Sequence, residues 1–246
     1  MWQKAFKYFL AVSLLLAVSS AFFWPHLDGH RIVQADIAQY RGMSQEISLY
    51  EEITGRAPLW TDAMFGGMPT YQIKTPDKGN YLKYFSRVLM LNRENPIGLM
   101  FTAMVCMFVL LLILKVDFIL AVLGAMVFGL ATNNILLYEV GHISKLRSVS
   151  FLPLILGAMV LAYRGQYLWG FFCFAIGLGL NLLANHVQMT YYFFLTVPIY
   201  LLAVLYDPSK SVQINRFVRA SLVLLVALLF SLGTAVSNLW PTYEYA

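Results

Sequence analysis

An acidic residue, Asp36, stands in the segment VQADIAQY, shortly after the first long apolar stretch of the chain. A carboxylate near a membrane surface could act as a general base or bind a substrate hydroxyl. An ordinary solvated acid in a loop is the alternative interpretation. Two further acids, Glu139 and Glu244, follow later apolar stretches, and either could be the partner of Asp36 or the base itself.

Basic residues follow Glu139 in the segment YEVGHISKLRS. Glu139, His142 and Lys145 are each separated by three positions, so a helical turn would gather them loosely on one side. Together with Arg147, the histidine and the lysine could bind an anion such as a phosphate. Contact with lipid headgroups is the alternative interpretation.

Amide and hydroxyl side chains recur in NLLANHVQMTYY, where Asn181, Asn185, Gln188 and Tyr192 have the spacing of one helical stripe. The apolar stretch around them is too long for one membrane span, so we expect a turn near Asn185 and His186 that interrupts the stripe. Polar residues at this depth usually face protein or a water-filled cavity. Asn185, His186 and Gln188 are therefore candidates for lining a cavity, although a hydrogen-bonded structural role for His186 is more common.

The composition defines the class of protein that carries these residues. Hydrophobic residues make up 60% of the 246 residues and charged residues only 12%. A soluble domain cannot bury that much apolar surface, so the bilayer must be its solvent. The net charge of +5 fits basic residues beside membrane spans better than nucleic-acid binding, which needs a clustered basic face. Both cysteines lie in apolar stretches and no zinc spacing is present, so no structural metal is expected.

Seven stretches approach the length of about 20 apolar residues that a membrane span needs. They predict an all-α, polytopic membrane protein, with one transmembrane domain over residues 1–246. The first stretch could be a cleaved signal peptide, but its apolar character continues through Trp24, which favours an uncleaved signal anchor. The predicted spans lie near residues 6–24, 97–114, 118–137, 149–163, 167–184, 187–206 and 217–239, and residues 25–96 form a long loop.

Basic residues in the short connections predict the orientation. With the N-terminus in the cytoplasm, only Lys145 and Arg147 fall in short outer loops. The long loop and almost every polar cluster then face outward, so we expect the active face to be extracytoplasmic. The basic residues that this orientation leaves inside are Lys4, Lys7, Lys115, Arg164, Lys210, Arg216 and Arg219.

Two parts of the long loop are predicted to be helical. Over Tyr81–Leu91 the apolar residues recur at three- and four-residue intervals, with basic residues on the opposite side. This pattern predicts an amphipathic helix at the membrane interface. The segment SQEISLYEEI is a weaker version of the same pattern. Between these helices, the glycine pair and proline of LWTDAMFGGMPTYQ predict a tight turn with Trp60, Phe65 and Tyr71 around it. A turn with aromatic residues at the membrane interface is the simplest interpretation.

Four segments appear in order between the apolar spans: PLWTDAMFGGMPTYQ, GHISKLRSVSFLPLILGAM, NHVQMTYY and LWPTYEY. In these segments the chain resembles the YfhO-like family of bacterial membrane proteins, and because family members are usually longer, it resembles their N-terminal part. The resemblance implies a GT-C-type glycosyltransferase fold, with a catalytic acid and juxtamembrane helices in the first outer loop. It also implies sugar transfer from a polyprenyl-phosphate carrier to an envelope glycan or lipid, at the outer face of the bacterial cytoplasmic membrane.

The resemblance assigns roles to particular residues. Asp36 is in the place of the general base, and His142, Lys145 and Arg147 are suited to binding the departing lipid phosphate. Trp60 and Tyr71 would form an aromatic wall of the substrate cavity. Because Ile37 follows Asp36, no paired-acid motif supports a divalent metal, and no cofactor is expected.

A non-catalytic transporter or scaffold for envelope lipids is the alternative function. It predicts a continuous polar path between the two faces, of which the cytoplasmic halves of the spans show little sign. The chain has no glycine-rich phosphate loop, nucleophile elbow or HExxH pair. Any energy-rich substrate would therefore arrive at the outer face already activated.

Overall fold

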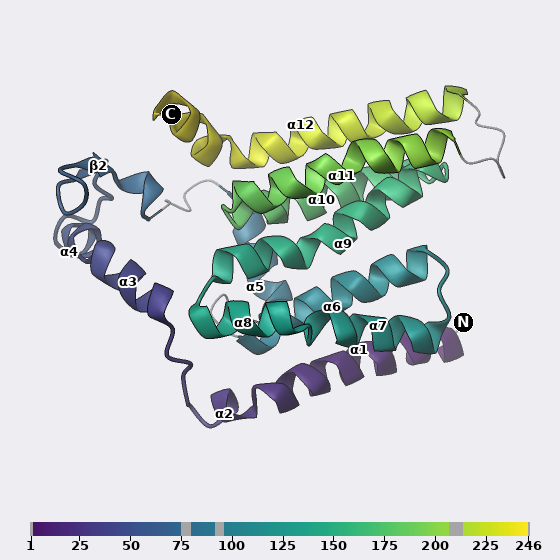
Figure 1. The fold of residues 1–246 in the computed structure, drawn as a ribbon, viewed down its shortest axis with the longest axis horizontal. Helices are drawn as coiled ribbons and strands as arrows, with labels where there is room; N and C mark the ends of the chain where they lie inside the picture. The colour runs from purple at the N-terminus through teal and green to yellow at the C-terminus, as the bar shows by residue number, and fades with distance from the viewer. Residues whose placement is uncertain (1, 75–79, 92–95, 207–213, 246) are drawn as a thin grey trace.

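A computed structural model describes residues 2–74, 80–91, 96–206 and 214–245 of the chain (Figure 1). The described residues are mainly helical, which confirms the predicted all-α class. Their elements are α1 (Trp2–Phe22), α2 (Trp24–Leu27), α3 (Ala35–Met43), α4 (Gln45–Thr54), β1 (Trp60–Thr61), β2 (Met68–Pro69), a 3₁₀ turn η1 (Thr70–Gln72), α5 (Leu82–Leu89), α6 (Pro96–Ile113), α7 (Phe118–Gly129), α8 (Thr132–Val140), α9 (Ile143–Tyr163), α10 (Tyr167–Leu183), α11 (Val187–Leu205) and α12 (Ile214–Tyr245).

Within the described residues, six helical segments are long and apolar enough to cross a membrane. The fifth predicted span, over residues 167–184, corresponds to α10, which is apolar but has only 17 residues. At 1.5 Å per residue it is about 25 Å long, shorter than a hydrocarbon core of about 30 Å. The six segments are Ala5–Phe22, Pro96–Ile113, Phe118–Val140, Ile143–Tyr163, Val187–Leu205 and Ile214–Glu244.

The long helices lie side by side in a bundle whose two ends differ (Figure 1). One end, called the loop end from here on, carries α3, α4 and the β-strands, the α8–α9 and α10–α11 turns, and the C-terminal end of α12 (left in Figure 1). The opposite end carries the N-terminus and the α6–α7 and α9–α10 connections. The polar clusters seen in the sequence therefore gather at one end of the bundle.

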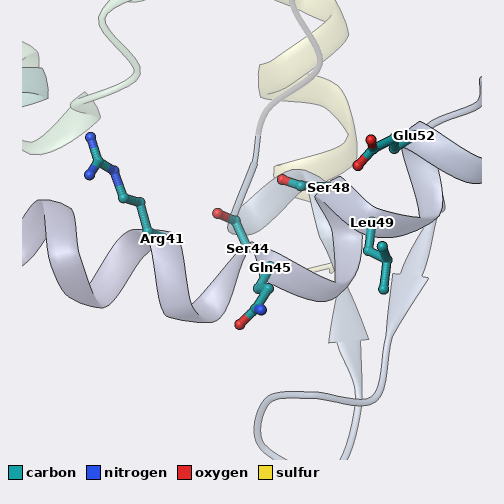
Figure 2. A pocket seen from close by; sticks show the side chains of 6 residues that line it. All are labelled: Arg41, Ser44, Gln45, Ser48, Leu49 and Glu52. Atoms are coloured by element: carbon teal, nitrogen blue, oxygen red, sulfur yellow. The ribbon is translucent and has the colours of Figure 1, made fainter.

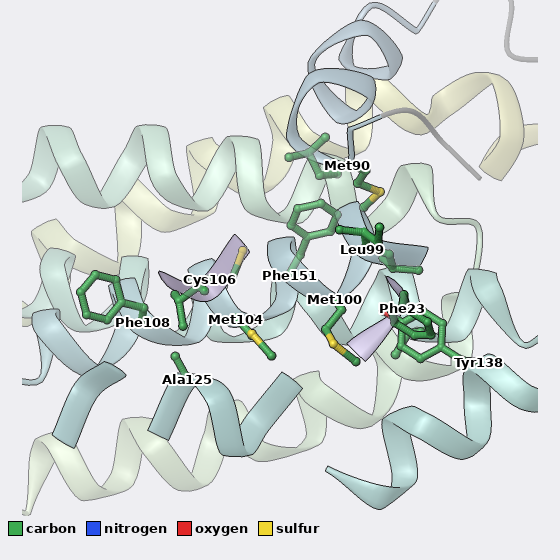
Figure 3. Packing of buried hydrophobic residues seen from close by; sticks show 14 of the residues in the cluster. Phe23, Met90, Leu99, Met100, Met104, Cys106, Phe108, Ala125, Tyr138 and Phe151 are labelled. Carbon is green, nitrogen blue, oxygen red and sulfur yellow. The ribbon is translucent and has the colours of Figure 1, made fainter. Parts of the chain in front are cut away.

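Two apolar clusters hold the bundle together. The first joins α1, α6, α7 and α9 around Met104, Phe108 and Phe151 (Figure 3). The second joins α9, α10 and α12 around Ile155, Leu178 and Ala227. By contrast, Thr190 is the only buried residue of α11, and most of the exposed side chains of this helix are apolar or aromatic. An apolar outer surface is what a bilayer solvent requires.

The third predicted span is one apolar stretch in the sequence but two helices in the structure. The chain leaves the helical conformation at Ala131, between α7 and α8. The buried Asn134 side chain donates a hydrogen bond of 2.7 Å to the Phe128 carbonyl, which also accepts from the Ala131 amide at 3.4 Å, so the carbonyl at the break is satisfied twice. Hydropathy does not detect such a break, because Leu130 and Ala131 are themselves apolar.

The fourth and last spans are longer than predicted. We expected residues 149–163 and 217–239, whereas α9 begins at Ile143 and α12 continues to Tyr245. The additional turns contain polar residues, which lower the hydropathy of a segment without ending its helix. As a result, Lys145 and Arg147 belong to a helix and not to a loop.

Helix α5 lies within the predicted amphipathic segment. Ser86 of α5 and Met90, directly after the helix, are buried. Tyr81 and Val88, by contrast, are 82% and 74% exposed. The buried Asn80 side chain fixes the start of α5, accepting from the Leu82 amide at 3.0 Å and donating to the Thr234 carbonyl of α12 at 2.8 Å. The long loop is therefore attached to the bundle at this helix.

The predicted tight turn is part of a β-hairpin. Strands β1 and β2 pair antiparallel, with Trp60 opposite Pro69. Gly67 has φ +120°, and a Cβ atom there would lie 2.8 Å from the Trp60 indole, so only glycine lets the ring lie against the backbone. The Thr61 hydroxyl donates to Glu46 of α4, and the Tyr71 hydroxyl donates to the Pro241 carbonyl of α12 at 2.9 Å. The hairpin is thus held between α4 and the end of α12.

Candidate functional site

At the loop end, Asp36 and His142 form a direct contact. Their Oδ2 and Nδ1 atoms are 2.5 Å apart, and their side chains are 36% and 49% exposed. Asp36 lies in the first turn of α3, a helix that the sequence did not predict, and His142 is the residue before α9. This contact joins two residues that the sequence had assigned to different roles.

Backbone packing holds the pair in place. Gly141 follows α8 with φ +100°, and its amide and that of His142 both donate to the Leu137 carbonyl, at 3.1 and 3.0 Å. This left-handed cap ends α8, as glycine commonly does at helix C-termini. A Cβ atom at Gly141 would lie 2.9 Å from Cβ of Gln34, so the start of α3 rests directly on this turn. The Gln34 amide also donates to the Tyr138 carbonyl at 2.5 Å.

A second histidine lies close to this pair. His186 occupies the turn between α10 and α11, where Asn185 has φ +54°. The Nδ1 atom of His186 is buried, with no hydrogen-bond partner among the described residues. Burial lowers the pKa of His186, and the charges of Lys145 and His142 lower it further, while an interaction with its own backbone raises it in part. The charges of Lys145 and His142 therefore act on His186, which lies at the same end of the bundle as the Asp36–His142 pair.

Asn181 has a structural role below this cluster. Its fully buried amide donates to the carbonyl and hydroxyl oxygens of Ser148, both at 2.8 Å, and accepts from the Thr190 hydroxyl at 2.6 Å. These bonds connect α9, α10 and α11 directly beneath Lys145 and His186. Sequence analysis had noted Asn181 but missed Ser148 and Thr190, because single hydroxyl residues in apolar helices carry no signal of their partners.

Other candidate residues lie apart from the pair or are oriented differently. Gly141 ends α8, so the expected helical turn containing Glu139, His142 and Lys145 does not form, and Glu139 is exposed at the end of α8. Arg147 follows Lys145 by two positions in α9, so the two side chains leave the helix about 200° apart. The expected single group of His142, Lys145 and Arg147 is therefore divided between two faces of α9.

The remaining candidates make local contacts. The exposed Gln188 amide donates to the Tyr192 hydroxyl at 2.7 Å. Glu244 accepts a hydrogen bond of 2.8 Å from the Trp240 indole. The Trp60 indole donates to Asp62 at 3.0 Å, and its ring is 53% exposed on the hairpin, while Tyr71 is bound to Pro241. Asn185 is exposed in the turn before His186.

An open hollow lies further along the loop, on α3 and α4 (Figure 2). It contains neither Asp36 nor His142, so it is separate from the paired residues. The side chains that line it are Arg41, Ser44, Gln45, Ser48, Leu49 and Glu52.

The Asp36–His142 pair and the basic residues at this end of the bundle are groups that can transfer a proton and bind an anion. Within the part of the chain that the structure describes, no three histidine, cysteine, aspartate or glutamate side chains come together as metal ligands would. A carboxylate–imidazole pair can accept a proton, and adjacent basic groups can hold a phosphate. Comparisons of the chain with protein-family models, with curated proteins and with solved structures find no match.

Proposed function

We propose that the protein is a membrane glycosyltransferase that uses a polyprenyl-phosphate-linked sugar and acts at the extracytoplasmic face of a bacterial cytoplasmic membrane. The observation that carries the proposal is the Asp36–His142 contact of 2.5 Å, at the end of the bundle that also carries Lys145 and His186. It supports the proposal because a carboxylate–imidazole pair can accept a proton and basic side chains can bind a phosphate. The resemblance to the YfhO-like family supplies the class of donor.

The proposed reaction needs two kinds of group. An acceptor hydroxyl must lose its proton as its oxygen bonds to the anomeric carbon of the sugar. The bond from that carbon to the phosphate oxygen breaks, and its electron pair leaves with the lipid phosphate. The Asp36–His142 pair supplies the base, while Lys145 and His186 lie where they could stabilise the departing phosphate.

The proposal includes an orientation. The loop end faces the outside of the cell and the N-terminus lies in the cytoplasm, as the basic residues of the short connections favour. An acceptor from the envelope could then reach Asp36 without crossing the membrane. The lipid tail of the donor would lie along the apolar outer surface that α11 and α12 present.

Sugar transfer in membranes that carry the protein tests the proposal. The membranes are supplied with a panel of radiolabelled polyprenyl-phosphate hexoses, and label in envelope glycans and lipids is measured. We expect Asp36→Asn to lower transfer by about 10²–10⁴-fold, the usual contribution of general-base chemistry. Asp28→Asn is the matched control, because Asp28 is an exposed acid of the same loop, and it should transfer at the wild-type rate.

Two outcomes would contradict the proposal. Full transfer by Asp36→Asn would remove the pair from the reaction. An inactive wild-type protein with every donor of the panel would favour the alternative of a lipid transporter or scaffold.

A further inference from the structure

The Asp36–His142 contact involves one particular nitrogen of the imidazole. Nδ1 of His142 is 2.5 Å from Oδ2 of Asp36, and the imidazole is 49% exposed. A carboxylate that accepts a hydrogen bond from Nδ1–H fixes the tautomer in which Nε2 carries the free lone pair. The ring nitrogen that can accept a proton is then the one directed away from Asp36.

We propose that His142 is the catalytic base of the transfer reaction and that Asp36 is a positioning residue, which rests on the proposed function and reassigns the base within it. An imidazole is ordinarily a stronger base than a carboxylate, with reference pKa values of about 6.5 for histidine and about 3.9 for aspartate. The carboxylate of Asp36 is already engaged by the ring. An acceptor hydroxyl therefore meets the stronger base at Nε2 of His142 without breaking the pair.

The backbone that carries His142 is held against the start of α3, and Asp36 is the contact that orients the ring. His142 directly follows Gly141, whose backbone rests on Gln34 and Asp36, where a Cβ atom at Gly141 would lie 2.9 and 3.4 Å from their Cβ atoms. The hydrogen bond of 2.5 Å from the Gln34 amide to the Tyr138 carbonyl also joins the start of α3 to α8. Positioning by backbone contacts of this kind is what a base needs in order to meet a hydroxyl at hydrogen-bond distance.

The step balances with these groups alone. The acceptor hydroxyl gives its proton to Nε2 of His142, and its oxygen forms the bond to the anomeric carbon. The carbon–oxygen bond to the lipid phosphate breaks, and the electron pair leaves on the phosphate. The imidazolium that results is stabilised by the Asp36 carboxylate, and it returns its proton to water after the products leave.

His142→Asn is the decisive variant, because the asparagine amide can replace Nδ1–H as the donor to Asp36 but offers no base. We expect its kcat for sugar transfer to fall by about 10²–10⁴-fold, with an unchanged melting temperature in detergent. His30→Asn is the matched control: His30 is an exposed histidine of the long loop, outside the Asp36–His142 pair, and we expect wild-type kcat. The assay uses membranes with the donor panel described above.

Chemical rescue distinguishes the two residues. Free imidazole should restore part of the kcat of His142→Ala. The double variant Asp36→Ala/His142→Ala should need a higher imidazole concentration for half-maximal rescue, because Asp36 no longer holds the ring. A purely structural role for Asp36 would leave that concentration unchanged.

Three results would overturn the inference. The first is His142→Asn with more than about half of the wild-type kcat, since removal of a general base costs far more. The second is rescue of Asp36→Ala by formate together with no rescue of His142→Ala by imidazole, which would make Asp36 the base. Either result, with an active wild type, leaves the proposed function intact. The third is an inactive wild type, which would overturn the proposed function and this inference together.

Discussion

The Asn181 side chain donates hydrogen bonds to both oxygens of Ser148, each at 2.8 Å, in an otherwise apolar region between α9 and α10. The same amide accepts from Thr190 of α11 at 2.6 Å. Thr190 is the only buried residue of α11, so this network attaches α11 to the bundle at its one buried position. We expect loss of the network to loosen the nearby α10–α11 turn, which carries His186.

Asn181→Leu should destabilise the protein by about 2 kcal/mol or more, because it leaves the hydroxyls of Ser148 and Thr190 buried without their partner. Thermal and denaturant unfolding in detergent micelles would measure the loss. Asn133→Leu is the matched control, since Asn133 is exposed in α8 and its replacement removes no buried network. Equal stability of the two variants would mean that the network contributes little.

Gly141→Ala should cost more than Gly55→Ala. Both glycines have positive φ, +100° and +67°, so both variants carry the backbone cost of about 1–2 kcal/mol for a side chain in this conformation. Only Gly141 also faces close neighbours, because its Cβ would meet Gln34 at 2.9 Å, whereas nothing lies within 4 Å of a Cβ at Gly55. Overpacking adds about 1–3 kcal/mol. Denaturant unfolding measures the difference in the free energy of unfolding. An equal loss in both variants would show that the start of α3 moves away from the new Cβ atom without cost.

Stability should fall as the pH is lowered, in part through His186. Burial lowers the pKa of His186 in the folded protein below its ordinary value of 6.5. The unfolded chain then binds a proton more readily, so the stabilisation is complete above about pH 6.5 and is lost as the pH falls towards the folded-state pKa. His186→Gln should lose less melting temperature than wild type between about pH 7.5 and about pH 5.5. His30→Gln should lose as much melting temperature as wild type over this pH range. If His186→Gln also loses as much as wild type, His186 is not a source of the pH dependence.

The pKa of His186 also makes a prediction for ligand binding. A phosphate beside His186 would offset the charges of Lys145 and His142 that lower its pKa, so binding should take up a proton. A short-chain prenyl-phosphate hexose, a phosphodiester that does not itself titrate in this range, should therefore bind more tightly as the pH falls from about 7.5 to about 6, measured by calorimetry in detergent. In His186→Gln this gain in affinity should be smaller. A gain equal to that of wild type would mean that a group other than His186 takes up the proton.

The predicted orientation can be tested with single cysteines. Cys106 and Cys173 lie in helices and would first be replaced by alanine. A cysteine at the exposed position Gln39 of α3 should react with a membrane-impermeant maleimide in intact cells. One at the exposed position Gln166, at the opposite end of the bundle, should react only after the membrane is permeabilised. The reverse pattern would invert the orientation and put the proposed site in the cytoplasm.

Much of the fold could be predicted because a membrane span is a local property of the sequence. The turn at Asn185 and His186 followed from length alone, and α10 and α11 indeed end and begin on either side of it. The amphipathic pattern before the second span corresponds to α5 for a similarly local reason. The break at Ala131 was missed because it depends on the bond from Asn134 to Phe128, which apolar composition does not reveal.

The site was less predictable because it depends on contacts between distant segments. Asp36 and His142 were each recognised by residue type and location, but their contact depends on the close packing of Gly141 against Gln34. Spacing placed Glu139 with His142, yet the left-handed cap at Gly141 separates the helices that carry them. The sequence does not give the φ angle of a glycine in a polar turn. It therefore could not show whether His142 would pair with Glu139 on one helical turn or with Asp36 of α3.

The short helix α10 has a consequence for the surrounding lipids. Its last turns lie against α5, where Leu82 approaches a Cβ position at Gly179 to 2.6 Å, and Asn80 ties α5 to α12. A span shorter than the hydrocarbon core usually forces the bilayer to thin around it. Because α5 of the long loop packs at this end of α10, we infer that it fills the missing depth and lets the bilayer keep its thickness. Removal of the loop would then thin the surrounding bilayer as well as removing Asp36.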